Sequence, residues 1–186
     1  MNALYGLGQA LLHALDPERA HDLAIKSLEL GIYPRATVPD DPRLAQELWG
    51  LKFRNPLGMA AGFDKGARVW APLLATGFGF VEVGTLTPKA QKGNPPPRIF
   101  RSAPDAAIIN RLGFNNEGQA AALPRLAATR TGVVGVNIGA GRDSEDRIGD
   151  YVSGIATMSA VADYLTINIS SPAASHFRGR QKYPEI

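Results

Sequence analysis

The sequence predicts an α/β fold built on a parallel sheet, and two observations support this prediction. Four short apolar runs of strand length alternate with three segments of helical pattern, and each run is followed by a loop that contains Gly or Ser. Such alternation is typical of right-handed βαβ units with a buried parallel sheet. The expected strands are 56–60, 80–83, 133–138 and 165–169, and the expected helices are 67–76, 116–128 and 147–160.

Two amphipathic helices are expected before this alternating region. Residues 2–15 place leucines at helical spacing, and Asp16 followed by Pro17 predicts the N-cap and first position of a second helix that ends near Leu30. The pair is interpreted either as a helical hairpin packed on a core or as two helices lying on a membrane surface. The leucine-rich and almost uncharged first helix favours the second interpretation. Residues 39–42 are expected to be a linker.

The interval between the second and third strands is too long for a single crossover connection. It contains Pro95-Pro96-Pro97 and two short extended pieces, 98–101 and 107–110. We therefore expect an inserted hairpin and loop on the side of the sheet where the strands end, the kind of excursion that often has a functional role.

Composition narrows the function classes. The 186-residue chain is 45% hydrophobic, which suits a globular protein, and its net charge is +3 from 20 basic and 17 acidic residues. It has no cysteine, which excludes disulfides and thiolate ligands, and its three histidines lack metal-ligand spacing. No metal is expected. Without a basic stripe no nucleic-acid partner is expected, and neither a membrane span nor a signal peptide is expected.

Polar side chains follow each of the four expected strands. Lys65 follows the first, Thr85 the second, Asn137 ends the third, and Asn168 with Ser171 ends the fourth. The carboxyl ends of parallel strands meet at one edge of the sheet, where ligands of α/β proteins bind. Neutral amides and hydroxyls with one lysine suit a heterocycle rich in carbonyl and N–H groups, such as a flavin or a pyrimidine. The alternative is a glycine-rich turn with an exposed Lys65.

The run 109–116 in the inserted segment is a second candidate site. Asn110 is suited to hydrogen-bond a polar ring, and Gly113 permits a close approach of the ligand to the backbone. The alternative interpretation is a turn followed by a helix that Asn115 or Asn116 caps. We expect both interpretations to hold for different residues of the run.

The ordered set of these motifs resembles the dihydroorotate dehydrogenases over residues 1 to about 172. The first helices, with 16–21, resemble the membrane-associated, quinone-dependent class of that family. The matching motifs are Asn55-Pro56-Leu57-Gly58, Ala60-Ala61-Gly62-Phe63-Asp64-Lys65, Gly84-Thr85-Leu86-Thr87-Pro88, Gly93-Asn94 with Pro97-Arg98-Ile99-Phe100-Arg101, Asn110-Arg111-Leu112-Gly113-Phe114-Asn115-Asn116, and Asn168-Ile169-Ser170-Ser171-Pro172.

The resemblance implies an incomplete (β/α)8 TIM barrel of about the first four strands, preceded by the N-terminal helical hairpin. A complete barrel typically needs about 250 residues. Three regions are expected: the hairpin at 1–38, the first half of the barrel at 39–172, and a divergent basic tail at 173–186.

The same resemblance implies oxidation of dihydroorotate to orotate in pyrimidine (UMP) biosynthesis, with FMN as cofactor and a membrane quinone as electron acceptor. Ser171 is implied as the catalytic base, and His21 and Arg101 are implied near the quinone. FMN-binding residues are implied at Ala61, Gly62, Lys65, Thr85, Asn137 and Asn168. Substrate-binding residues are implied at Lys65, Asn110, Arg111, Leu112, Gly113, Phe114 and Asn168. The implied location is peripheral, on the cytoplasmic face of the inner membrane, with contact through the N-terminal helices.

The sequence departs from the family after Pro172. The family pattern continues Asn-Thr-Pro-Gly-Leu-Arg, whereas this chain reads Ala173-Ala174-Ser175-His176. One hypothesis is an interruption of the reading frame just after Pro172, which leaves a truncated and inactive enzyme. A second interpretation is a non-catalytic remnant that associates weakly with a membrane surface. A third, a different flavin-dependent barrel, is disfavoured by the N-terminal helices together with the loop at Asn110.

Overall fold

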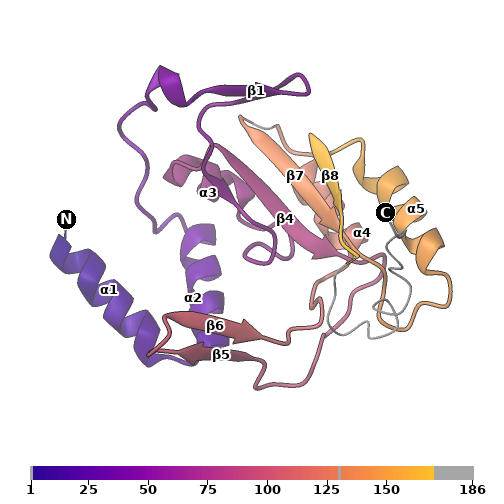
Figure 1. Ribbon diagram of the computed structural model, residues 1–186, viewed down its shortest axis with the longest axis horizontal. Helices are drawn as coiled ribbons and strands as arrows, with labels where there is room; N and C mark the ends of the chain where they lie inside the picture. The colour runs from indigo at the N-terminus through magenta and orange to yellow at the C-terminus, as the bar shows by residue number, and fades with distance from the viewer. Residues whose placement is uncertain (1, 130, 170–186) are drawn as a thin grey trace, which may run out of the picture.

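The protein is an α/β structure centred on a four-stranded parallel sheet. A computed structural model describes residues 2–129 and 131–169. Strands β3 (Gly58–Met59), β4 (Phe80–Leu86), β7 (Val133–Ile138) and β8 (Tyr164–Ile167) lie side by side in chain order (Figure 1). All three strand pairs are parallel, with Val81 opposite Val134 and Val136 opposite Leu165. The α/β prediction and the parallel sheet are confirmed.

The sheet has one apolar face and one polar face. Val81 and Val83 of β4 and Val134 and Val136 of β7 are fully buried and belong to the core. Alternate residues on the same strands point to the opposite face, because successive side chains of a strand alternate between faces. Glu82 and Asn137 therefore share the second face, where the functional site lies.

Three helices cover the apolar face of the sheet. They are α3 (Trp70–Thr76), α4 (Gln119–Leu126) and α5 (Arg147–Met158), and each lies between two consecutive strands of the sheet. Leu73 of α3, Leu126 of α4 and Met158 of α5 are buried against the strand valines. The prediction placed the start of α3 at Ala67, but the helix begins at Trp70. The Asp64 carboxylate accepts hydrogen bonds from the amides of Arg68 and Val69, both at 2.7 Å, and holds this segment in a turn.

Two helices precede the sheet, α1 (Asn2–Ala14) and α2 (Pro17–Glu29). The Asp16 side chain accepts hydrogen bonds from the amides of Glu18 and Arg19, at 3.0 and 3.1 Å, so the predicted N-cap is confirmed. Helix α2 adds Ile25 and Leu28 to the core of the sheet. Within the described ranges, no helix has the length and hydropathy needed to cross a membrane.

A small antiparallel hairpin, β1 (Gln46–Leu48) and β2 (Leu51–Phe53), lies at the amino-terminal end of the sheet, after a short 3-10 helix at Pro42–Leu44 (Figure 1). The sequence prediction missed this hairpin. Its turn consists of Trp49 and Gly50, which have φ values of 53° and 77°, as in a type I′ turn. An apolar cavity of about 330 Å³ lies between the hairpin and the side chains of Phe80 and Tyr164.

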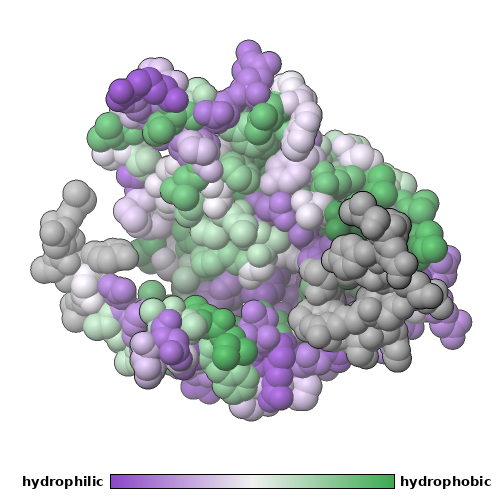
Figure 2. Space-filling model, in the orientation of Figure 1, coloured by the Kyte–Doolittle hydropathy of each residue, from purple (hydrophilic) through white to green (hydrophobic). Residues whose placement is uncertain are grey.

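The predicted insertion is a second antiparallel hairpin, β5 (Ile99–Ser102) and β6 (Ala107–Asn110). It lies beside α2, on the side of the molecule toward which the sheet strands point (Figure 1). Two arginines connect it to the N-terminal helices: Arg98 pairs with Glu18 of α2, and Arg101 donates to the carbonyl oxygens of His13 and Leu15 at 3.2 and 2.8 Å. In the space-filling view, the surface between the two hairpins is recessed (Figure 2).

Candidate active site

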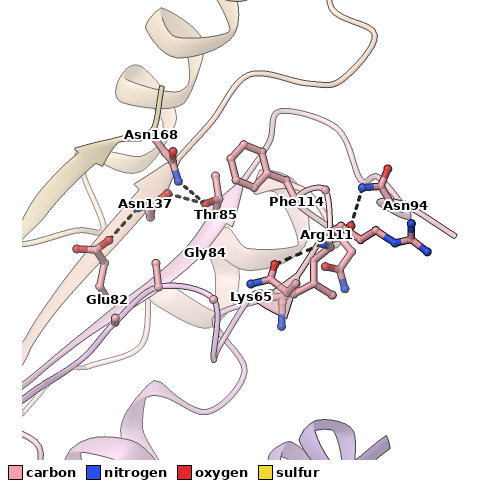
Figure 3. A pocket seen from close by; sticks show the side chains of 16 residues that line it. Lys65, Glu82, Gly84, Thr85, Asn94, Arg111, Phe114, Asn137 and Asn168 are labelled. Atoms are coloured by element: carbon pink, nitrogen blue, oxygen red, sulfur yellow. Dashed lines mark hydrogen bonds between the residues drawn. The ribbon is translucent and has the colours of Figure 1, made fainter. Parts of the chain in front are cut away.

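A cavity of about 720 Å³ lies where the strands of the parallel sheet end. This first cavity lies between the ends of β3, β4, β7 and β8 and the loop that follows β6 (Figure 3). Its volume is in the range of small-molecule and cofactor sites. It is lined by Ala60, Ala61, Gly62, Lys65, Glu82, Gly84, Thr85, Asn94, Asn110, Arg111, Leu112, Gly113, Phe114, Asn115, Asn137 and Asn168.

The cavity brings together every FMN-binding and substrate-binding residue that the sequence predicted. All of them belong to the lining, although they come from five separate segments of the chain. Lys65 is half-buried, so the alternative of a turn with an exposed lysine is wrong. Burial lowers the pKa of its ammonium group.

Hydrogen bonds across three strands fix the polar side of the cavity (Figure 3). The Thr85 hydroxyl donates to Oδ1 of Asn137 at 2.7 Å, and Nδ2 of Asn168 donates to the Thr85 oxygen at 3.1 Å. Thr85 and Asn137 are buried. Since these bonds connect β4 to β7 and to the end of β8, the amide groups are held in defined orientations.

The loop after β3 passes close to β4 and exposes backbone to the cavity. The amide of Gly62 donates to the carbonyl oxygen of Gly84 at 2.8 Å, and the amide of Gly84 donates to that of Asp64 at 2.9 Å. Gly62 has a φ of 104°, which a residue with a side chain rarely adopts. A ligand can therefore lie directly against the backbone at this point.

The loop after β6 forms the opposite wall of the cavity. Gly113 and Phe114 have positive φ values of 74° and 55°, so the loop makes a sharp turn here. Asn94 fixes this wall, because its Nδ2 donates to the carbonyl oxygen of Arg111 at 2.6 Å. Asn110, at the end of β6, lies on the cavity surface.

The prediction that Asn115 or Asn116 caps the next helix is wrong. Helix α4 begins after Gly118, and no side chain caps it. The Asn116 carboxamide instead accepts from the amides of Gly118 and Thr87, at 2.8 and 3.2 Å, and so joins the loop to the end of β4. Asn115 lines the first cavity, and its buried Oδ1 has no hydrogen-bond partner among the described residues.

Sequence reasoning assigned no site role to Glu82 or Asn94, which both line the first cavity. Glu82 accepts hydrogen bonds from Nδ2 of Asn137 at 2.9 Å, from the Thr166 hydroxyl at 3.0 Å and from the Tyr164 hydroxyl at 3.2 Å. A signal for Glu82 was present, since it is a charged residue inside an otherwise apolar strand.

A second cavity, of about 380 Å³, lies between α2, the loop after β3 and the β5–β6 hairpin. His21 lines this cavity, and Nζ of Lys65 lies 3.4 Å from its Nε2. Burial, and then the Lys65 charge, lower the pKa of the His21 imidazole. Lys65 and Asn115 line both cavities, so the two spaces are adjacent. The structure does not bring Arg101 to this cavity with His21, because the Arg101 guanidinium binds carbonyl oxygens at the end of α1.

Two predictions concern residues that the structure does not describe. Ser171, the predicted base, and the tail at 173–186 lie outside the described residues.

In the part of the chain that the structure describes, no group of three or more His, Asp or Glu side chains could hold a metal ion.

The lining is suited to a planar, polar heterocycle rather than to a metal or a phosphate alone. It offers amides from Asn110, Asn137 and Asn168, the Thr85 hydroxyl and two cationic side chains, Lys65 and Arg111. This donor set suits a ring with carbonyl and N–H groups, such as a flavin or a pyrimidine.

Comparisons with known proteins agree with this geometry. Residues 43–186 match the family described as dihydroorotate dehydrogenase. The chain is 58% identical to the dihydroorotate dehydrogenase (quinone) of Agrobacterium fabrum over 183 residues, covering 97% of this chain and 50% of that protein. It is 57% identical to the enzyme of the same name from Mesorhizobium japonicum, covering 100% of this chain and 52% of that protein.

A solved structure shows the same relationship in three dimensions. The crystal structure of dihydroorotate dehydrogenase from Eimeria tenella in complex with ferulenol superposes with a TM-score of 0.83 at 45% identity. The match covers 88% of this chain and 46% of that one. The chain spans about half the length of the relatives it matches. The protein thus belongs to the dihydroorotate dehydrogenase family.

Proposed function

We propose that this chain provides FMN-binding and substrate-binding residues for the oxidation of dihydroorotate to orotate in pyrimidine biosynthesis, with a quinone as electron acceptor. The observation that supports this most directly is the first cavity, in which every predicted cofactor and substrate residue with a described position meets. The relatives named dihydroorotate dehydrogenase (quinone) support the choice of substrate and acceptor.

In this proposal, Thr85, Asn137 and Asn168 hydrogen-bond the flavin ring, and Ala61 and Gly62 present backbone to it. Lys65 and Asn110 hold the carboxylate and ring amides of dihydroorotate, and Ser171 takes the proton from C5. A serine hydroxyl is a weak base, so it needs a neighbouring acceptor or water to pass the proton on. When bound, FMN supplies the acceptor for the hydride that leaves C6 of dihydroorotate.

We further propose that β3, β4, β7 and β8 are the first four strands of a (β/α)8 barrel. Exposed apolar side chains on the last described elements support this. Ile148 and Val152 of α5 are 77% and 61% exposed, and Ile167 of β8 is 43% exposed. Such surfaces fit the side of a unit that packs against the next βα unit of a barrel.

Flavin binding tests the proposal. FMN fluorescence is titrated with the purified 186-residue chain, and orotate is then added to the complex. We expect quenching that Lys65→Ala and Asn137→Ala weaken and that orotate changes, because orotate occupies the same cavity. Lys52→Ala, an exposed substitution on β2, is the control and leaves binding unchanged. Absence of any FMN binding would contradict the proposal for this chain, and insensitivity to orotate would favour a different flavin-dependent barrel.

A second function is favoured by the N-terminal helices: peripheral association with the cytoplasmic face of the inner membrane, with or without catalysis. Helix α1 has no acidic or basic residue other than His13, and Leu11 and Leu23 are 59% and 45% exposed. Co-sedimentation with liposomes tests this. We expect binding that Leu11→Asp with Leu23→Asp abolishes, whereas Ile148→Asp on α5 has no effect.

A further inference from the structure

Glu82 is the only acidic residue among those that line the first cavity in the described part of the chain. Its half-buried carboxylate receives three hydrogen bonds, from Asn137 on β7 and from Tyr164 and Thr166 on β8. Removing a carboxylate from water is costly unless donors satisfy it. The site surrounds this side chain with donors from two neighbouring strands.

The Glu82 carboxylate fixes the direction of a chain of hydrogen bonds that runs from it through Asn137 and Thr85 to Asn168 (Figure 3). A carboxylate can only accept, so Asn137 turns its Nδ2 toward Glu82 and its Oδ1 toward Thr85. That Oδ1 also can only accept, so the Thr85 hydroxyl donates its proton to it. The Thr85 oxygen is then left to accept from Nδ2 of Asn168.

We propose that Glu82 is a positioning residue that sets the orientation of the Asn137 and Asn168 amides in the cavity. An asparagine amide has similar shape in its two flipped states, so its orientation depends on its hydrogen-bond partners. Glu82 determines which end of each amide faces its neighbour and, as a result, which donors and acceptors the cavity offers to a heterocycle. The role of these amides toward FMN and substrate rests on the proposed function, whereas the chain of hydrogen bonds does not.

The side-chain amide signals of Asn137 and Asn168 in ¹⁵N–¹H NMR spectra of the ligand-free chain test this inference. We expect Glu82→Leu to shift the signals of both residues, because Asn137 loses its acceptor and the change passes through Thr85. In a Thr85→Val background the path is interrupted. There Glu82→Leu still shifts Asn137 but no longer shifts Asn168.

Two further variants keep the test decisive. Thr166→Val removes a donor to Glu82 that lies outside the path, so the Asn168 signal stays close to its wild-type position. If Glu82→Leu does not fold, Glu82→Gln keeps the volume but replaces one acceptor oxygen with a donor, and the same two signals shift. An Asn168 signal that stays unchanged in every folded Glu82 variant would overturn the inference.

Flavin titration separates this inference from the proposed function. Where the wild-type chain binds FMN, Glu82→Leu is expected to weaken binding about five- to tenfold, as loss of one well-formed hydrogen bond does. In the Thr85→Val background, Glu82→Leu is expected to weaken FMN binding by a much smaller factor. An equal loss in both backgrounds would show that Glu82 does not act through Thr85. If wild-type protein binds no FMN, the proposed function fails and the NMR comparison alone decides the role of Glu82.

Discussion

Nζ of Lys65 lies 3.4 Å from Nε2 of His21, so the lysine of the first cavity contacts helix α2. The imidazole ring of His21 also packs edge-on against Phe63, with 5.1 Å between the ring centroids. The N-terminal helices and the candidate active site are therefore in direct contact. A change in charge on one of the two groups affects the other.

The first prediction concerns the titration of His21. Burial and the Lys65 charge hold its pKa below the ordinary value of 6.5, while Asp22 and Glu18 act in the opposite direction. We expect Lys65→Met to raise the His21 pKa, measured by NMR titration of the ring protons. Lys52→Met, on the exposed strand β2, leaves it unchanged. An unchanged pKa in Lys65→Met would contradict the contact.

The same shift gives a pH dependence of stability. The folded protein binds the His21 proton less readily than the unfolded chain does. The contribution of His21 to the free energy of unfolding is therefore complete above pH 6.5. It decreases as the pH falls from 6.5 through the lower pKa of the folded protein. Urea unfolding at pH 7.5 and pH 5.5 measures this pH dependence. His21→Gln is expected to reduce the difference between the free energies of unfolding at the two pH values.

The second prediction concerns the ion pair that joins α2 to the segment before β5. Nε of Arg98 lies 3.0 Å from both carboxylate oxygens of Glu18, and the two side chains are only 11% and 24% exposed. Glu18→Gln removes the charge and is expected to lower the free energy of unfolding by about 2 kcal/mol. Urea denaturation measures it, with the exposed Glu145→Gln as a control that changes stability by less than about 0.5 kcal/mol. Equal losses of stability in Glu18→Gln and Glu145→Gln would show that the Glu18–Arg98 pair does not stabilise the fold.

This pair also predicts behaviour in acid. The hydrogen bond to Arg98 holds the pKa of Glu18 below its ordinary value of 4.5. Its stabilisation is present above pH 4.5 and decreases as the pH falls through that value. The stability difference between wild type and Glu18→Gln is expected to narrow over the same range of pH.

The third prediction concerns Gly135, which leaves room for the Tyr164 ring on the polar face of the sheet. A Cβ atom at Gly135 would lie 2.1 Å from Cζ of that ring. Gly135→Ala is expected to cost about 1–3 kcal/mol, because the ring or the strand must move. Thermal unfolding measures it. In a Tyr164→Val background the cost should largely disappear, and a cost that persists would show that the ring is not the cause.

Gly8 in helix α1 is the matched control for Gly135. A Cβ atom there would meet nothing within 4 Å, so Gly8→Ala is expected to be neutral or to stabilise the helix by up to about 1 kcal/mol.

The fourth prediction concerns the turn between β1 and β2. Trp49 is 93% exposed and has a φ of 53°, which a bulky residue adopts only at a cost. Asparagine tolerates this conformation, so Trp49→Asn is expected to raise stability by up to about 1 kcal/mol. Trp49→Ala removes the ring without relieving the backbone and serves as the control. Thermal unfolding followed by circular dichroism distinguishes the two, and equal gains would contradict the role of φ.

The sheet could be predicted from the sequence because its strands are continuous apolar runs. Strand β7 has the predicted bounds, since Val133–Ile138 is buried along its whole length. Strand β8 begins at Tyr164, whose ring packs over Gly135, and ends at Ile167, so it starts one residue before and ends two residues before the predicted range. Strand β3 is shorter than predicted. It consists of Gly58 and Met59 alone, and Pro56 in the preceding segment has no amide hydrogen to donate to a ladder.

The β1–β2 hairpin was missed because local sequence rules do not reveal it. Each of its strands has only three residues, and its turn contains a tryptophan at a position where Asn, Asp or Gly is usual. Gly50 was the only local signal for the turn.

The candidate site was predicted well at strand ends and poorly inside strands. Lys65, Thr85, Asn137 and Asn168 follow or end strands, and polar residues at those positions point to a site. Glu82 lies within a strand, and its role depends on Thr166 and Asn137 from other strands. Such a relationship depends on register between distant segments, which a single sequence does not contain.

Arg101 has a mechanical consequence. Its guanidinium holds the last carbonyl groups of α1, and its strand, β5, is hydrogen-bonded along its length to β6. Ile99 at one end of this ribbon pairs with Asn110, which lies on the cavity wall. Hydrogen bonds thus connect helix α1, the β5–β6 hairpin and the cavity wall at Asn110. We expect a tilt of α1 to move the β5–β6 hairpin and, with it, Asn110.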